Sequence, residues 1–383
     1  MLKFFVALVI EGIENMEIRQ KENALFLPFL KLPTGHHHVA DAVMKELQNT
    51  FQTLNCEKVD ILSYSYGPIE RLVSTAYISW IKIMPKAYDK LYQYLAVNNQ
   101  TNRSRQLVYE VLFTSFFKRL MEKNQPRILF CTHSLPSNLA SVLKQKNQLQ
   151  ATTVNVYTDF FVNRVWGISG IDYHLVPSIR MKNFLLELGV DESTIYVTGI
   201  PIHPIFKKTS QCLSRNKRLT VLITGGSLGM GAIEKLIPTK PTIHYIVLCG
   251  KNEKLYQRLQ QKNDPLITPI NYIENKEKMN GIYDQVDAVV TKPGGVTVSE
   301  CLMKRKPIFT CSALPGQEKV NELELKELGV IYPINIGLGN VESHIKDFFQ
   351  NKEAKTLYEE AVNVFHRHLD KKSLPEILQE ICL

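Results

Sequence analysis

The 383-residue sequence lacks the patterns that mark three common classes of protein. Its seven cysteines are odd in number and widely spread, with no C-x-x-C pair and no Cys/His set at zinc spacing, so neither a disulfide scaffold nor a zinc site is predicted. No internal repeat or low-complexity tract is evident. These absences favour a folded cytosolic protein with reduced, mostly buried thiols.

The only candidate targeting segment is the N-terminal MLKFFVALVI. Its apolar run is too short to span a bilayer, and no small-residue cleavage site follows it. Met16 is an alternative start, which would make residues 1–15 an upstream extension and place the first strand a few residues in. We therefore treat 1–23 as an N-terminal extension, with a short membrane hook as the other interpretation.

The composition predicts a soluble protein of two ordinary domains, because 44% of residues are hydrophobic and 22% are charged. Lys and Arg exceed Asp and Glu by nine, which favours a polyanionic partner such as nucleic acid or a leaflet of acidic lipids. Since no aromatic-basic module or nucleic-acid recognition motif is present, we expect no nucleic-acid partner.

Apolar runs of strand length alternate with helical stretches along the whole chain, which is typical of βαβ units and parallel sheets. Two such series predict an α/β protein with two Rossmann-like domains. The first series comprises residues 24–30, 59–64, 127–132, 152–157, 173–178 and 194–199. The second comprises 219–224, 243–250, 286–291, 307–311 and 329–334.

The segment GIPIHPIFKK separates the two series, and Pro201 and Pro204 stiffen it. This places a domain joint near residue 204, between an N-terminal domain at 24–204 and a C-terminal domain at 205–355. The tail, 356–383, is predicted to form helices, with a polar break near residues 371–373.

Residues 66–124 interleave aromatic, aliphatic and Lys/Arg side chains at helical spacing. Such helices can lie on a membrane with rings at the headgroups and cations on phosphates. Packing on the first sheet is the better explanation for most of these residues. We expect only the part around Trp80 to Tyr94 to meet lipid.

The most informative motif is an apolar strand, VDAVVT, followed by Lys292, Pro293, Gly294 and Gly295 and then by a helix. Bare backbone N–H groups and the helix dipole at such a turn favour an anion such as a diphosphate. Glu300 lies one to two turns into the helix, where a carboxylate can take both hydroxyls of a ribose. This spacing suits a nucleotide sugar.

A second glycine-rich turn, TGGSLGMG, follows the first strand of the second domain. Taken alone it is often only a structural turn. The KPGG turn and the PGQEKVN loop strengthen the binding interpretation, because they can converge with it at the carboxyl ends of the strands. The donor-binding candidates in this turn are Gly225, Gly226, Ser227 and Gly229.

In the first domain, Gly35 and three histidines follow the first strand. Consecutive helical residues point in different directions, so the histidines are not predicted to hold a metal. His36 is the best placed to face the cleft as an acid/base or acceptor-binding group. Asp159 follows a strand end, and Trp166 lies a turn or two beyond. Gly35 and Trp166 are candidates for the acceptor or membrane side of the cleft. A helix cap by Thr158 or Asp159 is the alternative.

Seven segments together resemble the diacylglycerol glucosyltransferase and monogalactosyldiacylglycerol synthase family, in family order from about residue 24 to beyond 330. They are GHHHVA (35–40), YTDFFVNRVW (157–166), DYHLVPS (172–178), VTGIPIHPIF (197–206), TGGSLGMG (224–231), TKPGGVTVSECL (291–302) and LPGQEKVNELEL (314–325). A more distant likeness is to the glycosyltransferase that adds N-acetylglucosamine to lipid-linked muropeptide.

The resemblance implies a GT-B fold and an inverting, metal-independent hexosyltransferase. In such a fold 24–204 would be the acceptor domain, which faces the membrane, and 205–355 would be the nucleotide-sugar domain across a cleft. The helices of 356–383 would pack back on the N-terminal domain. A UDP-sugar, with glucose or galactose, would be the donor, and diacylglycerol or a glycolipid would be the acceptor. The enzyme would be cytoplasmic and peripherally bound to an anionic membrane, and would need no cofactor. Matched residue by residue, Glu300 would hold the ribose, His36 would stand beside the acceptor, and the other contacts to the donor would come from Gly294, Gly295, Thr297, Gln317, Glu318 and Asn321.

These residues predict a single displacement in which an acceptor hydroxyl attacks the anomeric carbon as UDP leaves. His36 is the expected base because an imidazole pKa lies near working pH, and Asp159 is the fallback. Lys292 would add positive potential beside the diphosphate, or would be an ordinary packing lysine. The alternatives are transfer to a soluble or polyprenyl-linked acceptor, and a catalytically idle protein that senses UDP-sugar.

Overall fold

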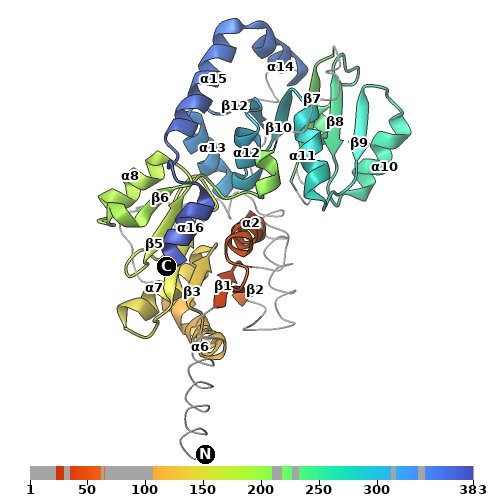
Figure 1. The fold of residues 1–383 in the computed structure, drawn as a ribbon. Helices are drawn as coiled ribbons and strands as arrows, with labels where there is room; N and C mark the ends of the chain where they lie inside the picture. The colour runs from red at the N-terminus through yellow and green to blue at the C-terminus, as the bar shows by residue number, and fades with distance from the viewer. Residues whose placement is uncertain are drawn as a thin grey trace, which may run out of the picture.

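A computed structural model describes residues 23–29, 35–61, 64, 107–208, 218–226, 233–311, 316–334 and 341–382. The proposed extension with Met16 and the predicted lipid-facing segment from Trp80 to Tyr94 lie outside these ranges. Within them the chain forms two lobes, each built on a parallel sheet with helices against it, as Figure 1 shows. No helix in these ranges is both long and apolar enough to cross a bilayer.

The first lobe contains a six-stranded sheet in the order β2-β1-β3-β4-β5-β6. Each neighbouring pair is parallel, and in register Phe26 lies opposite Phe130, with the two rings stacked 4.6 Å apart. The strands are β1 (Asn23–Leu27), β2 (Asn55–Lys58), β3 (Ile128–Cys131), β4 (Thr152–Val156), β5 (Tyr173–Val176) and β6 (Ile195–Val197). The helices are α2 (Gly35–Thr50), α6 (Leu107–Asn124), α7 (Ser134–Gln145) and α8 (Ile179–Glu187), with the short η2 (Glu192–Thr194) before β6.

The second lobe repeats this arrangement with the order β12-β11-β10-β7-β8-β9. Its strands are β7 (Thr220–Thr224), β8 (His244–Leu248), β9 (Ile267–Ile270), β10 (Ala288–Thr291), β11 (Ile308–Thr310) and β12 (Tyr332–Pro333). Its helices are α9 (Ile233–Leu236), α10 (Glu253–Lys262), α11 (Lys276–Gln285), α12 (Gly295–Met303), α13 (Gln317–Glu327), α14 (Val341–Gln350) and α15 (Lys352–Arg367). The predicted α/β class with two Rossmann-like sheets is confirmed.

Two strand predictions were wrong, both at sheet edges. The strand expected at 59–64 is instead β2, four residues earlier, where a polar and mostly exposed NCEK pairs with β1. Of the apolar residues that prompted the prediction, Ile61 is buried and Val59 is partly buried, both beyond the strand end. The other error is β9, which was not expected; its Pro269 is tolerated because an edge strand leaves one side unpaired.

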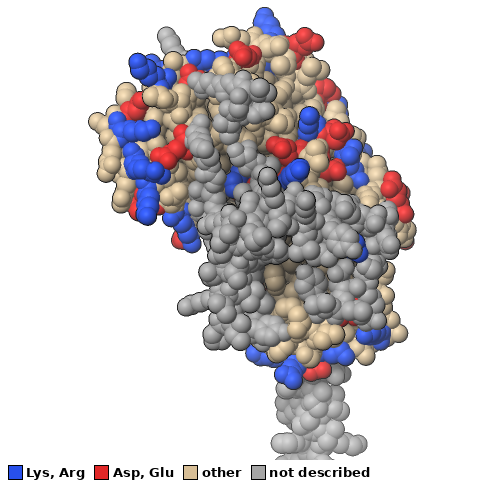
Figure 2. All heavy atoms as spheres, turned by 180° about the vertical axis from the view of Figure 1, so that it is seen from behind, with Lys and Arg blue, Asp and Glu red and all other residues tan. Residues whose placement is uncertain are grey.

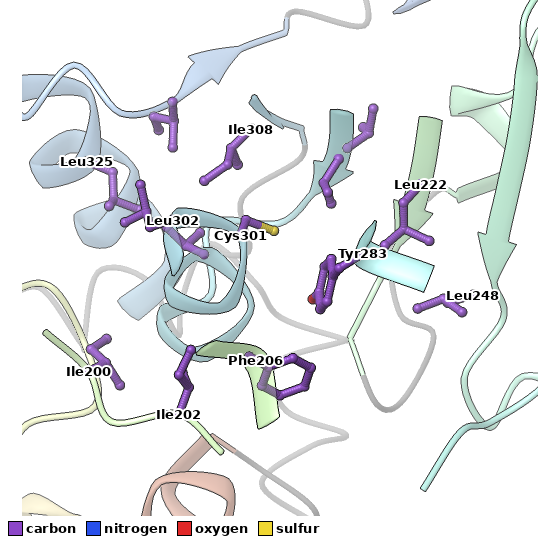
Figure 3. Packing of buried hydrophobic residues seen from close by; sticks show 14 of the residues in the cluster. Ile200, Ile202, Phe206, Leu222, Leu248, Tyr283, Cys301, Leu302, Ile308 and Leu325 are labelled. Atoms are coloured by element: carbon purple, nitrogen blue, oxygen red, sulfur yellow. The ribbon is translucent and has the colours of Figure 1, made fainter. Parts of the chain in front are cut away.

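The chain crosses between the lobes twice. The first crossing runs from β6 to η3 (Pro204–Lys207), and Figure 3 shows its Ile200, Ile202 and Phe206 against the second lobe. There the ring of Phe206 meets Tyr283 edge to face at 5.7 Å. These contacts make one buried cluster continuous across both lobes.

The second crossing follows α15, and α16 (Leu374–Cys382) then returns to pack against α2 (Figure 1). It is tied to the first crossing, because the backbone N–H of Asp370 donates to the carbonyl of Val197 at 2.9 Å and the Asp370 carboxylate accepts from the Val197 N–H. Beside this pair, the side chain of Leu369 lies close to Gly199. The two crossings therefore meet at one point.

Candidate active site

The functional candidates lie where strands of both sheets end. In the first lobe His36 follows β1 and Asp159 follows β4; in the second, Gly225 follows β7 and Lys292 follows β10. Because all strands in each sheet are parallel, each set shares one edge. Contacts between the lobes join these two edges, which makes the junction the candidate site.

His36 is the second residue of α2, and its Nδ1 is fixed by the first lobe. That nitrogen lies 2.8 Å from the carbonyl oxygen of Thr132 and 2.9 Å from Oγ1 of Thr158. Burial lowers the pKa of His36 to about 4, although the hydrogen bond to Thr132 acts in the opposite direction. The expectation of a pKa near neutrality was therefore wrong, and the ring is neutral at pH 7.

Asp159 and Asn321 join the two lobes. The Nδ2 amide of Asn321, on α13, donates to Oδ1 of Asp159 at 2.8 Å, and its Oδ1 accepts from the N–H of Phe160 at 2.7 Å. Asn321 is 1% exposed. Burial raises the pKa of Asp159 to about 6, and the Asn321 amide partly offsets this. Asn321 thus holds the loop after β4, in place of the predicted contact with sugar or ribose.

The turn after β10 brings the start of α12 against the same loop. Gly294 is the N-cap residue and Gly295 the first helical residue. A Cβ added to Gly295 would lie 2.2 Å from the carbonyl oxygen of Thr158, whereas one added to Gly294 would meet nothing within 4 Å. Across the same junction, a Cβ on Gly35 would lie 3.3 Å from Val296. Only glycine at 295 permits this approach of the lobes.

Glu300 is buried in the middle of α12, together with Tyr283 of α11. The Tyr283 hydroxyl donates to Oε2 of Glu300 at 2.8 Å, and the carboxylate is 8% exposed. Burial raises the pKa of Glu300, while the charge of Lys276 and the Tyr283 hydrogen bond lower it. No described residue donates to Oε1. Tyr283 therefore orients the carboxylate and leaves one oxygen for a ligand. Thr297, one turn earlier, is partly buried.

The N-termini of α12 and α13 have no side-chain cap, unlike those of α7, α8, α10, α11 and α15. The first N–H groups of α12 are therefore available to an anion. Lys292 and Pro293 precede α12, and both are buried. The Nζ of Lys292 lies 3.8 Å from Oε1 of Glu318, which with Gln317 begins α13. Burial lowers the pKa of Lys292, and Glu318 partly offsets that effect.

Gly225 and Gly226 directly follow β7, as predicted for a tight strand-to-helix turn. Gly226 has φ of +75°, which favours glycine, and its N–H donates to Oγ1 of Thr224 at 3.2 Å. Ser227 and Gly229 lie outside the described residues. The turn therefore has the glycine geometry that the sequence indicated, at the same sheet edge as Lys292.

Trp166 does not face a lipid. Its ring is 6% exposed and packs on Tyr157 with centroids 4.5 Å apart, so it belongs to the core of the first lobe and not to the predicted acceptor or membrane surface. Trp80 lies outside the described residues. Within the described ranges, no group of three or more His, Cys, Asp or Glu side chains is arranged to hold a metal ion.

Sequence reasoning missed Thr132 and Tyr283, and it gave Thr158 only a possible capping role. Each acts through one atom, a carbonyl or a hydroxyl, that meets a residue far along the chain. No local pattern in the sequence predicts such long-range contacts. The one signal that could have drawn attention to Thr132 and Thr158 is that they lie one and two residues after the ends of β3 and β4.

Two families match in succession along the chain. Monogalactosyldiacylglycerol (MGDG) synthase matches residues 36–202, and the glycosyltransferase family 28 C-terminal domain matches residues 220–373. The first match contains His36, Thr158 and Asp159, and the second contains the turns around Gly225 and Gly295. The two matches thus divide the candidate site between them.

Relatives of full length agree with this division. The chain is 43% identical over 365 residues to the uncharacterized glycosyltransferase YkoN of Bacillus subtilis, covering 94% of this chain and 97% of that one. It is 27% identical over 348 residues to a processive diacylglycerol beta-glucosyltransferase of Bacillus cereus, covering 85% and 87%. Among solved structures, MurG of Acinetobacter baumannii has the same fold, with a TM-score of 0.57 at 14% identity over 94% of this chain and 99% of that one. The predicted family, GT-B fold and enzyme class are confirmed: the chain belongs to the glycosyltransferases that join an MGDG synthase domain to a family 28 C-terminal domain.

Proposed function

We propose that this glycosyltransferase moves a hexose, glucose or galactose, from a UDP-sugar to diacylglycerol or a glycosyldiacylglycerol, with inversion and without a metal. The observation that carries the proposal is the junction itself. A neutral histidine and a carboxylate from one sheet edge meet the uncapped N-terminus of α12 and a buried glutamate from the other. One edge suits a hydroxyl acceptor and the other suits a nucleoside diphosphate.

The donor would lie on the second lobe. Its diphosphate would accept hydrogen bonds from the N–H groups that begin α12, with positive potential from the helix dipole and from Lys292. Glu300 would accept both ribose hydroxyls through the carboxylate that Tyr283 orients. These groups would stabilise UDP as it leaves, which is the role that a metal ion fills in other transferases.

The acceptor hydroxyl would attack from the first lobe. Because the Thr132 carbonyl can only accept, the proton of neutral His36 sits on Nδ1, and Nε2 keeps its lone pair. The hydroxyl proton would pass to Nε2 while the oxygen bonds to the anomeric carbon and the bond from that carbon to the UDP oxygen breaks. Asp159, ionised above about pH 6, would stabilise the positive charge that develops on the sugar.

A membrane site would bring the lipid acceptor to this junction. The relatives named as diacylglycerol glucosyltransferases support a lipid acceptor, and the net charge of +9 supports an anionic surface. On the face that Figure 2 shows, Lys and Arg side chains are interspersed with Asp and Glu over the described atoms. The proposal places the enzyme peripherally on the cytoplasmic membrane.

The test is to incubate the protein with UDP-glucose or UDP-galactose and vesicles of dioleoylglycerol in anionic phospholipid, and to analyse the lipids. We expect a hexosyldiacylglycerol with a β linkage, since inversion converts the α linkage of the donor. His36→Ala should bind UDP as before and lose transfer. Transfer to soluble sugars alone, or UDP-sugar binding without turnover by the wild-type protein, would contradict the proposal.

A further inference from the structure

A second histidine, His133, adjoins His36 where β3 ends. It is the N-cap residue of α7, and its ring packs edge to face against His36 with centroids 4.8 Å apart. On its other side the ring stacks on Phe29 at 4.5 Å. The side chain keeps partial exposure. Two imidazoles therefore lie side by side at the acceptor edge, and the function proposed above uses only one of them.

The hydrogen bonds give the two rings opposite tautomers. The N–H of Leu135 donates to Nδ1 of His133 at 3.1 Å, so this nitrogen carries a lone pair and the proton of the neutral ring sits on Nε2. In His36 the arrangement is reversed, because Nδ1 faces the Thr132 carbonyl. His36 thus presents a bare nitrogen and His133 presents an N–H. Among the described residues, neither Nε2 has a hydrogen-bond partner.

Both rings are held in these neutral states. Burial lowers the pKa of His133 well below its usual value, and proximity to His36 lowers it further. Because His133 resists protonation, a proton that His36 takes up does not pass on to His133. The pair can accept one proton at one position and donate one hydrogen bond from the other.

We propose that His133 is a second acceptor-binding residue, whose Nε2–H donates to the hydroxyl oxygen that His36 deprotonates. This inference rests on the proposed function. A hydroxyl oxygen has one proton and two lone pairs. With the proton directed to His36 and one lone pair occupied by His133, the remaining lone pair is the one that attacks the anomeric carbon. His133 thereby fixes the angle of attack.

Two substitutions separate this role from helix capping. His133→Asn keeps an oxygen at the position of Nδ1 to cap α7, but it has no donor at the position of Nε2. His133→Gln places an amide N–H near the position of Nε2 and loses the short-range cap. Both variants should bind UDP as the wild type does, because His133 lies on the first lobe.

We expect His133→Asn to lower kcat/KM for transfer from UDP-glucose to dioleoylglycerol vesicles about 10- to 100-fold, as for the loss of one directed hydrogen bond. His133→Gln should recover most of the rate despite a lower Tm. The reverse order, or equal losses in two variants with normal UDP binding, would overturn the inference and leave His133 as a cap.

A second measurement does not depend on the acceptor. Nitrogen NMR of the protein labelled with ¹⁵N-histidine should show His36 protonated on Nδ1 and His133 protonated on Nε2; a proton on Nδ1 of His133 would overturn the inference. If the wild-type protein transfers glucose to no lipid, the proposed function fails by itself. The two variants are then compared in hydrolysis of UDP-glucose, where water replaces the acceptor, and equal rates would again reject His133.

Discussion

Gly295→Ala should open the junction between the lobes without damaging either lobe. The added Cβ would lie 2.2 Å from the Thr158 carbonyl oxygen and 2.7 Å from Cδ1 of Ile200, whereas ordinary contact begins at 3.4 Å. The carbonyl belongs to the backbone and cannot turn aside. The start of α12 and the loop after β4 must therefore separate by about 1 Å, as overpacking requires.

That separation would also break the Asn321 bridge. Its hydrogen bonds, at 2.7 and 2.8 Å, would lengthen beyond the range in which such bonds hold. Two lost hydrogen bonds at about 1 kcal/mol each, with roughly 1 kcal/mol of residual strain, cost the closed state about 3 kcal/mol, which is roughly a 100-fold loss of its population. We expect kcat/KM for transfer to fall by about the same factor.

The assay compares transfer rate, UDP affinity by calorimetry and the closed population by fluorescence energy transfer between the lobes. UDP affinity should stay within about threefold, because the new methyl group points at the first lobe. A threefold change corresponds to about 0.6 kcal/mol of binding free energy. Gly281→Ala is the matched control, since it makes the same change on α11, where a Cβ meets nothing within 4 Å. A Gly295→Ala protein that closes and turns over like the wild type would refute the reasoning.

Three further predictions concern pH, the donor and stability. The transfer rate should fall as pH drops through about 6, where Asp159 gains a proton. Asn321→Ala should raise the pH of this midpoint, because it removes the amide that favours the ionised carboxylate. A midpoint that does not move would show that Asp159 does not control the pH dependence of transfer. Glu300→Ala should weaken UDP binding about 30- to 100-fold by calorimetry, and unchanged affinity would reject its place at the ribose. Asp284→Ala should lower the free energy of unfolding in urea by about 3 kcal/mol, because it leaves Lys304 buried without the carboxylate 2.9 Å away; a loss under 1 kcal/mol would show that the pair is solvated.

The interior of the fold was predictable from the sequence because central parallel strands are continuous apolar runs. VDAVVT and LTVLIT gave β10 and β7, which pair in register in the middle of the second sheet. The edges were not predictable in the same way. The exposed NCEK of β2 and the proline-containing β9 carry little hydrophobic signal, because an edge strand buries less of its surface.

In the site, the turns could be predicted and the contacts between lobes could not. The local strand-turn-helix pattern correctly placed Gly294 and Gly295 at the start of α12 and Glu300 within it. Asn321 lies 162 residues from Asp159, and nothing local shows that its amide turns to the other lobe. The expected near-neutral pKa of His36 was wrong for a similar reason, because burial by segments distant in the sequence lowers it.

The tie between Val197 and Asp370 has a consequence for how the enzyme works. Because the two crossings are hydrogen-bonded to each other at one point, we expect them to act as a hinge. The lobes can then rotate apart but cannot translate past each other. In the proposed function, each cycle of substrate entry and product exit would then return His36 to the same position opposite the donor sugar. In the proposed function, the backbone crossings would therefore align donor and acceptor at every closure, whichever acceptor has arrived.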